Sequence, residues 1–190
     1  DLSCKLPLPG DYMARDALLA AAAALESGVE PVAVADAVQT FKMLPMRWEQ
    51  SKVGGVSFVN DAYNANPVSM EAALRSFADV GCRGRRWLVL GGMRELGRDS
   101  NAAHAALGRS AADCGDFIVA VGKEGERVAE GSLQNGFACE NVFKAKNARA
   151  AAELLAAHAR TGDAVLLKAS RALRLENVIA KYKDLIKHRD

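Results

Sequence analysis

The spacing of hydrophobic residues changes near residue 55. Before this point two alanine-rich segments, 16–27 and 31–41, are typical of short helices; Gly28 follows the first and Pro31 starts the second. From Val56 onward, short apolar runs alternate with longer helical patterns. The pattern predicts strands at 56–60, 87–92, 117–122, 141–145 and 164–170. It predicts helices between and after them at 69–80, 101–114, 124–133, 148–159 and 173–185.

Near-continuous apolar strands alternating with helices indicate strands that are buried on both sides. We therefore predict an α/β fold with a mostly parallel, Rossmann-like sheet, helices on both faces, and a short helical segment before it. The stretch LPMRWEQSKVGG, residues 44–55, has no apolar periodicity and contains Pro45 and two glycines. We expect the domain boundary there, with residues 1–45 in one domain and 46–190 in the next.

Polar residues follow four of the predicted strands, where an open parallel sheet binds its ligands. The polar clusters are at 61–67 (DAYNANP), 91–97, 122–125 and 168–171. The Asp61 carboxylate suits the two hydroxyls of a ribose, and Tyr63, Asn64 and Asn66 suit a base or a phosphate. The alternative is that these side chains make turn and helix-cap hydrogen bonds, with Pro67 starting the next helix.

Two cations and a hydroxyl, Lys168, Arg171 and Ser170, leave the last predicted strand together. Such a cluster suits a carboxylate or a phosphate, and the alternative is a solvated strand end. His104 follows the 91–97 loop by less than two helical turns, so it is a candidate for the same edge. No pair of residues has the spacing of metal ligands, and we predict no metal site.

The segment from Gly92 to Gly97 is close to the phosphate-binding pattern GxxxxGK[ST] but departs from it at the decisive positions. Arg98 and Asp99 stand where the lysine and the hydroxyl residue belong, and an aspartate repels phosphate. The chain contains no GxGxxG, the pattern that would indicate a nicotinamide cofactor. Neither type of glycine-rich nucleotide loop is therefore predicted.

Composition narrows the class of partner. The 190 residues include 25 basic and 23 acidic ones, a net charge of +2, so a nucleic-acid partner is not predicted. No apolar run approaches the roughly 18 residues of a membrane span. No basic segment precedes an apolar core as in a signal peptide. The cysteines lie far apart without a CxxC, which favours reduced thiols in a cytoplasmic protein.

Three stretches together carry a resemblance to a known family. They are DAYNANPVSMEAAL, LGGMRELGRDSNAAH and LLKASRALRLENVI, which start at Asp61, Leu90 and Leu166. In order and spacing they resemble the bacterial Mur ligases, and DAYNANP resembles the branch that adds D-alanyl-D-alanine to UDP-N-acetylmuramoyl-tripeptide. The segment 46–49 (MRWE) resembles the arginine-bearing junction before the C-terminal domain, and residues 1–45 resemble the end of the central ATPase domain.

The resemblance implies an ATP- and Mg²⁺-dependent amide ligase of peptidoglycan synthesis, cytoplasmic and monomeric. The family converts a substrate carboxylate to an acyl phosphate that the incoming amine attacks. For the nucleotide the resemblance implies Arg47 near phosphate and Asp61 near ribose, with further contacts from Tyr63, Asn64 and Asn66. For the incoming dipeptide it implies Glu95, His104, Lys168, Ser170 and Arg171.

Departures from the family pattern leave alternatives open. The family's GKT loop, modified lysine and magnesium ligands belong to a central-domain region not found in these residues, so no catalytic residue is assigned and the chain alone is expected to be inactive. The family's GxHNxxN stretch has Tyr12, Met13 and Asp16 at its polar positions, and Gly92 replaces the acid of an LGDM-type loop. A related ligase with another acceptor and a non-catalytic binding module are the alternatives.

Overall fold

The computed structural model describes residues 4–7 and 10–187. The chain divides into two compact units, Asp1–Met43 and Leu44–Asp190. The division lies two residues before the boundary that we predicted. None of the helices in the described part of the chain is long and apolar enough to cross a membrane.

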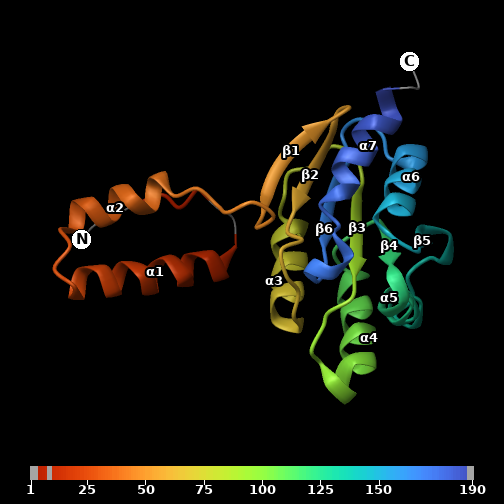
Figure 1. Ribbon diagram of the computed structural model, residues 1–190, viewed down its shortest axis with the longest axis horizontal. Coiled ribbons are helices and arrows are strands. Elements are labelled where there is room, and N and C mark those ends of the chain that lie inside the picture. Colours follow the sequence, from red (N-terminus) through yellow and green to blue (C-terminus); the bar gives the residue numbers. More distant parts are fainter. Residues whose placement is uncertain (1–3, 8–9, 188–190) are drawn as a thin grey trace. The chain divides into compact units, whose positions relative to one another are not determined.

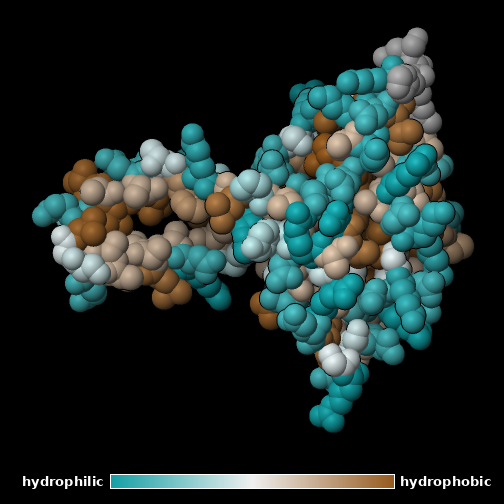
Figure 2. Space-filling model, viewed as in Figure 1, coloured by the Kyte–Doolittle hydropathy of each residue, from teal (hydrophilic) through white to brown (hydrophobic). Residues whose placement is uncertain are grey.

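The first unit contains two packed helices, α1 (Asp11–Glu26) and α2 (Pro31–Thr40). Gly28 ends the first of them with a left-handed φ of 83°, which glycine adopts without steric cost. Both predicted helices are confirmed, although α1 begins five residues earlier than expected. Of the hydrophobic residues described in this unit only Ala35 is buried, and Figure 2 shows apolar side chains on the surface of the helical pair.

The second unit is a six-stranded sheet with the order β1-β2-β6-β3-β4-β5 (Figure 1). All neighbouring strands are parallel except β1 and β2. The strands are β1 (Glu49–Val53), β2 (Val56–Asn60), β3 (Arg86–Gly91), β4 (Phe117–Val121), β5 (Val142–Ala145) and β6 (Ala164–Lys168). The α-helices are α3 (Pro67–Ala78), α4 (Ser100–Ala111), α5 (Gly122–Gln134), α6 (Ala148–His158) and α7 (Asn177–Lys187). The 3-10 turns are η1 (Gly97–Asp99), η2 (Cys139–Asn141) and η3 (Arg171–Leu173).

The mostly parallel sheet is confirmed, and β1 is the strand that the sequence pattern missed. Its first four residues are exposed, because it is an edge strand, and it therefore has no apolar alternation. Gly54 and Gly55, with φ of 56° and 79°, form the turn that leads to β2. This glycine pair, which we interpreted only as a boundary signal, is the hairpin signal. α7 begins four residues later than predicted, after the left-handed Arg174.

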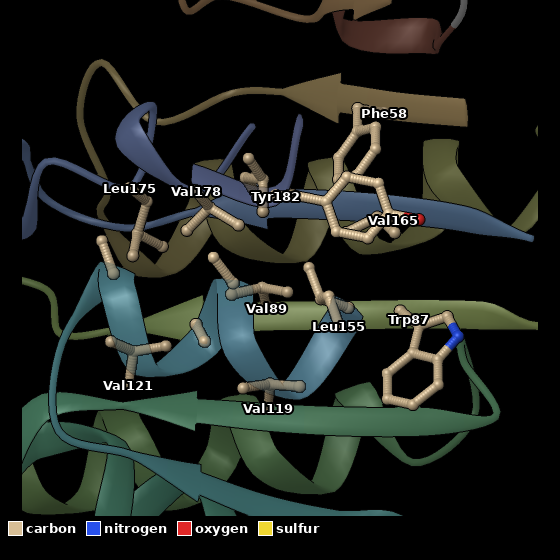
Figure 3. Close-up of a cluster of buried hydrophobic side chains, with 14 of the residues drawn as sticks. Phe58, Trp87, Val89, Val119, Val121, Leu155, Val165, Leu175, Val178 and Tyr182 are labelled. Carbon is tan, nitrogen blue, oxygen red and sulfur yellow. The ribbon is translucent and has the colours of Figure 1, made fainter. Parts of the chain in front are cut away.

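Helices cover both faces of the sheet, as predicted. On one face α6 and α7 pack on strand residues that include Phe58, Trp87 and Val165, as Figure 3 shows. The Phe58 and Tyr182 rings lie 5.1 Å apart, and the indole nitrogen of Trp87 donates a hydrogen bond to Asp163 at 2.9 Å. The opposite face is covered by α3, α4 and α5 (Figure 1). Burying a large apolar side chain completely stabilises the fold by about 1.5–3 kcal/mol relative to leaving it exposed. The packed core therefore holds the strands, and with them the strand ends, in fixed positions.

Candidate functional site

The carboxyl ends of four parallel strands meet at one edge of the sheet, because β2, β6, β3 and β4 are consecutive neighbours. Backbone hydrogen bonds attach the loop after β2 to strand β6, and the loop after β6 to the segment after β3. Asp61 N–H donates to Leu167 at 2.9 Å, and Ser170 N–H donates to Gly92 at 2.9 Å. The polar residues that follow these strands therefore lie at one edge of the sheet, and the ligand contacts expected of them stay a prediction.

A buried ion pair fixes the loop after β2. Lys168, the last residue of β6, is 3% exposed, and its Nζ lies 2.6 Å from Asp61 Oδ2. The same ammonium group lies 3.4 Å from the Asp61 carbonyl oxygen and 3.3 Å from that of Asn64. An ammonium has three donors, and all three have protein partners here. This geometry does not favour the direct dipeptide contact that the resemblance implied for Lys168, because such a contact requires the ion pair to open.

The segment before β1 is attached to the same loop. Trp48 N–H donates to Asp61 Oδ1 at 3.3 Å, and Tyr63 N–H donates to the Met46 carbonyl at 3.1 Å. The Arg47 guanidinium lies over the Tyr63 ring, 4.3 Å from its centroid, and both side chains are exposed. Met46 and Trp48 have left-handed φ values of 61° and 52°, an uncommon conformation for residues other than glycine. The segment before β1 thus places Arg47 beside Tyr63, in the same loop after β2 that carries Asp61.

The two asparagines of this loop make the local hydrogen bonds of the alternative interpretation. Asn64 Oδ1 accepts from the next backbone N–H, that of Ala65, at 2.9 Å. Asn66 Oδ1 accepts from Ser69 N–H at 2.8 Å and Ser69 Oγ accepts from Asn66 N–H, a reciprocal capping box at the start of α3. The amide oxygens are therefore engaged within the chain, and the nucleotide contacts implied for these residues stay a prediction.

The loop after β3 is held by a neutral histidine. Met93 N–H donates to His104 Nε2 at 2.8 Å, and His104 Nδ1 lies 2.6 Å from the Ser100 carbonyl oxygen. Because Nε2 accepts, the proton is on Nδ1, which donates to Ser100. The ring is 1% exposed and neither nitrogen is left for a ligand. This geometry does not favour the direct substrate contact that the resemblance implied for His104; its visible role is to hold the loop.

The remaining predicted substrate residues lie around the same edge. Glu95 is exposed and has a left-handed φ of 65°. Ser170 is 5% exposed, and Arg171 forms an ion pair with Glu176. The side chain of Arg171 lines a surface hollow together with Ala172, Arg174, Glu176 and Asn177.

Sequence reasoning left out two acids at this edge. Glu49 Oε2 accepts from Met46 N–H at 3.0 Å and from Asn60 Nδ2 at 3.2 Å, which fixes the segment before β1. Glu124 lies in the first turn of α5, directly after β4, and its side chain occupies the space that a Cβ atom on Gly92 would enter. For Glu124 a signal was present in the sequence, because it belongs to one of the four polar strand ends.

Arg47, Tyr63 and Asp61 fit one part of a nucleotide site. A guanidinium stacked on an aromatic ring offers its donors to phosphate, and a carboxylate suits ribose hydroxyls. In the described residues no group of three or more His, Cys, Asp or Glu side chains is arranged to hold a metal ion.

A mostly parallel sheet covered by helices, with an exposed Arg–Tyr stack and a buried ion pair at its strand ends, defines a Rossmann-like α/β domain. The chain matches the family described as Mur ligase, glutamate ligase domain, over residues 46–171. The chain therefore belongs to the Mur ligase family.

Curated relatives and solved structures agree with this family. The UDP-N-acetylmuramoyl-tripeptide--D-alanyl-D-alanine ligase of Bacillus subtilis (strain 168) is 34% identical, covering 95% of this chain and 39% of the relative. The ligase of the same name from Mycobacterium leprae is 35% identical, covering 90% and 36%. A crystal structure of MurF from Acinetobacter baumannii has a TM-score of 0.82 and 27% identity, covering 95% of this chain and 39% of that one. MurF of Thermotoga maritima in complex with ADP has a TM-score of 0.71 and 25% identity, covering 89% and 37%. The chain thus spans less than two thirds of the length of these relatives.

Proposed function

We propose that the protein carrying this chain is an ATP-dependent amide ligase that joins D-alanyl-D-alanine to UDP-N-acetylmuramoyl-tripeptide in the cytoplasm. The observation that carries the proposal is the convergence of Arg47, Asp61 and Tyr63 at the strand ends. The names of the relatives support the reaction, and the ADP complex of the Thermotoga maritima structure supports the nucleotide.

The chemistry explains why such a site needs cations. A carboxylate is a poor electrophile until one oxygen becomes a leaving group, which transfer of the ATP γ-phosphoryl group provides. The amine then attacks the carbonyl carbon, the C–O bond to phosphate breaks, and the amine loses a proton. Mg²⁺ would neutralise phosphate charge when bound. In this chain the proposed contribution is binding and orientation, with Arg47 on phosphate and Asp61 on ribose.

The other predicted residues take two kinds of role in this proposal. Tyr63, Asn64 and Asn66 border the nucleotide, and Lys168 keeps the Asp61 carboxylate in place. Glu95, Ser170 and Arg171 face the dipeptide, for which a guanidinium is suited to the terminal carboxylate. Lys168 acts through Asp61 in this scheme, because its own donors are already engaged.

Arg47→Ala in the full-length ligase tests the nucleotide role. Loss of a charge-assisted hydrogen bond to phosphate is expected to raise the KM for ATP by about tenfold or more. The variant should still fold, because Arg47 is exposed and the substitution removes its contact with the Tyr63 ring. Arg83→Ala, an exposed arginine near the opposite end of β3, is the matched control. An unchanged KM for ATP in Arg47→Ala would contradict the assignment.

One observation favours a second candidate, a related ligase with another acceptor. Gly92 stands where an LGDM-type loop has an acid, at the edge proposed to meet the dipeptide. Phosphate release measured with a panel of amines and dipeptides separates the two candidates. A preference for an acceptor other than D-alanyl-D-alanine selects the related ligase. If no acceptor stimulates phosphate release, the remaining alternative is a non-catalytic binding module.

A further inference from the structure

The buried Gly92 lies between two loops at the site edge. Its carbonyl oxygen accepts from Ser170 N–H at 2.9 Å. A Cβ atom built on Gly92 would lie 2.9 Å from Glu124 Cβ and 3.1 Å from Glu124 Oε2. The space that a side chain at position 92 would need is therefore occupied by Glu124, whose carboxylate reaches this edge from α5.

From this arrangement we propose that Glu124 supplies the carboxylate that position 92 lacks, and that it binds the ammonium group of the incoming amine. The inference rests on the proposed function. An aspartate at 92 would attach its carboxylate to that same Cβ, so the two acids would occupy one region of the site. A glycine at position 92 then leaves the space that the acid at position 124 fills.

The surroundings of Glu124 suit an ammonium ligand. The side chain is exposed, and among the described residues it makes no hydrogen bond or ion pair, so its charge is available. The backbone carbonyl of Gly92 accepts a hydrogen bond from Ser170, and Arg171 is the next residue in the chain. A dipeptide carries an ammonium group and a carboxylate, which complement one acid and one guanidinium.

A structural role for Glu124 is the competing explanation. An acid in the first turn of a helix interacts favourably with the helix dipole, and this effect changes stability without changing affinity for one substrate. Substrate-specific kinetics separates the two roles. Glu126 is exposed, lies two residues further along α5 and carries the same charge, so it is the matched control.

The test uses steady-state kinetics of the full-length ligase with Glu124→Gln and Glu126→Gln. Glu124→Gln keeps the shape and removes the charge, so the KM for D-alanyl-D-alanine should rise about tenfold while the KM for ATP stays within about twofold. Glu126→Gln should change neither constant. If the Glu124→Gln enzyme is active and its KM for D-alanyl-D-alanine is unchanged, the inference about Glu124 is overturned while the proposed function stands. A wild-type enzyme without amine-dependent phosphate release overturns the proposed function and this inference with it.

A swap of the two positions provides a second test. Gly92→Asp alone should impair the enzyme, because it crowds Glu124 and places two like charges together. Glu124→Gly alone should raise the dipeptide KM, and it also removes the Glu124 Cβ atom, which would lie 2.9 Å from a Cβ at position 92. Combining it with Gly92→Asp returns one carboxylate to the same space, and the dipeptide KM should fall back toward the wild-type value. A double variant no better than Glu124→Gly would overturn the proposed exchange.

Discussion

The loops after β2 and β3 lie at the same edge of the sheet, yet different kinds of interaction hold them in place. Residues 61–66 are fixed by a buried ion pair between Asp61 and Lys168, and residues 92–96 by the neutral ring of His104. The first anchor contains charges that a bound phosphate would influence, whereas the second has none. The first loop is thus suited to respond to ligand charge, and the second to keep its shape.

Removing the charged anchor should have the largest effect on stability. Lys168→Met leaves the Asp61 carboxylate, which is 16% exposed, without its counter-ion, and we expect a loss of about 3 kcal/mol in the free energy of unfolding. Urea unfolding followed by tryptophan fluorescence reports on the second unit, because Trp48 and Trp87 are the chain's two tryptophans.

Two controls define what this loss means. Asp61→Asn combined with Lys168→Met removes both charges and should recover part of the stability. Arg149→Met breaks an ion pair whose side chains are 78% and 51% exposed, and it should cost no more than about 0.5 kcal/mol. If Lys168→Met were as mild as Arg149→Met, the ion pair would not be the anchor of the loop.

The neutral anchor should have a smaller effect. His104→Leu leaves the buried Met93 N–H without an acceptor, at a cost of about 1–3 kcal/mol. His104→Gln can place an amide oxygen near the former Nε2 position and should recover much of the loss. The measurement is again urea unfolding. Equal losses in the leucine and glutamine variants would show that ring packing, and not the hydrogen bond to Met93, holds the loop.

Sequence patterns predicted the parallel sheet and the meeting of its polar ends, because both depend on apolar periodicity and strand order. They missed β1, whose exposed polar residues carry no such periodicity. They also gave no indication that Lys168 and His104 are buried with their polar atoms satisfied, because partner choice is decided by tertiary contacts. Lys168 and Asp61 are 107 residues apart in the sequence. The types of residue at strand ends therefore indicate where a site lies. They do not show which of these residues contact a ligand and which hold the loops in place.

The smallest effect expected here concerns the helices that follow the two loops. Asn66 caps α3 through a reciprocal hydrogen-bond pair with Ser69, whereas Asp99, at the N-cap of α4, makes no side-chain cap hydrogen bond. Asn66→Ala should therefore lower the free energy of unfolding by about 1 kcal/mol, and Asp99→Ala should leave it nearly unchanged. Urea unfolding of the two variants side by side checks this difference. Equal losses would mean that the cap does not distinguish the loops, and that the anchors Lys168 and His104 account for the contrast by themselves.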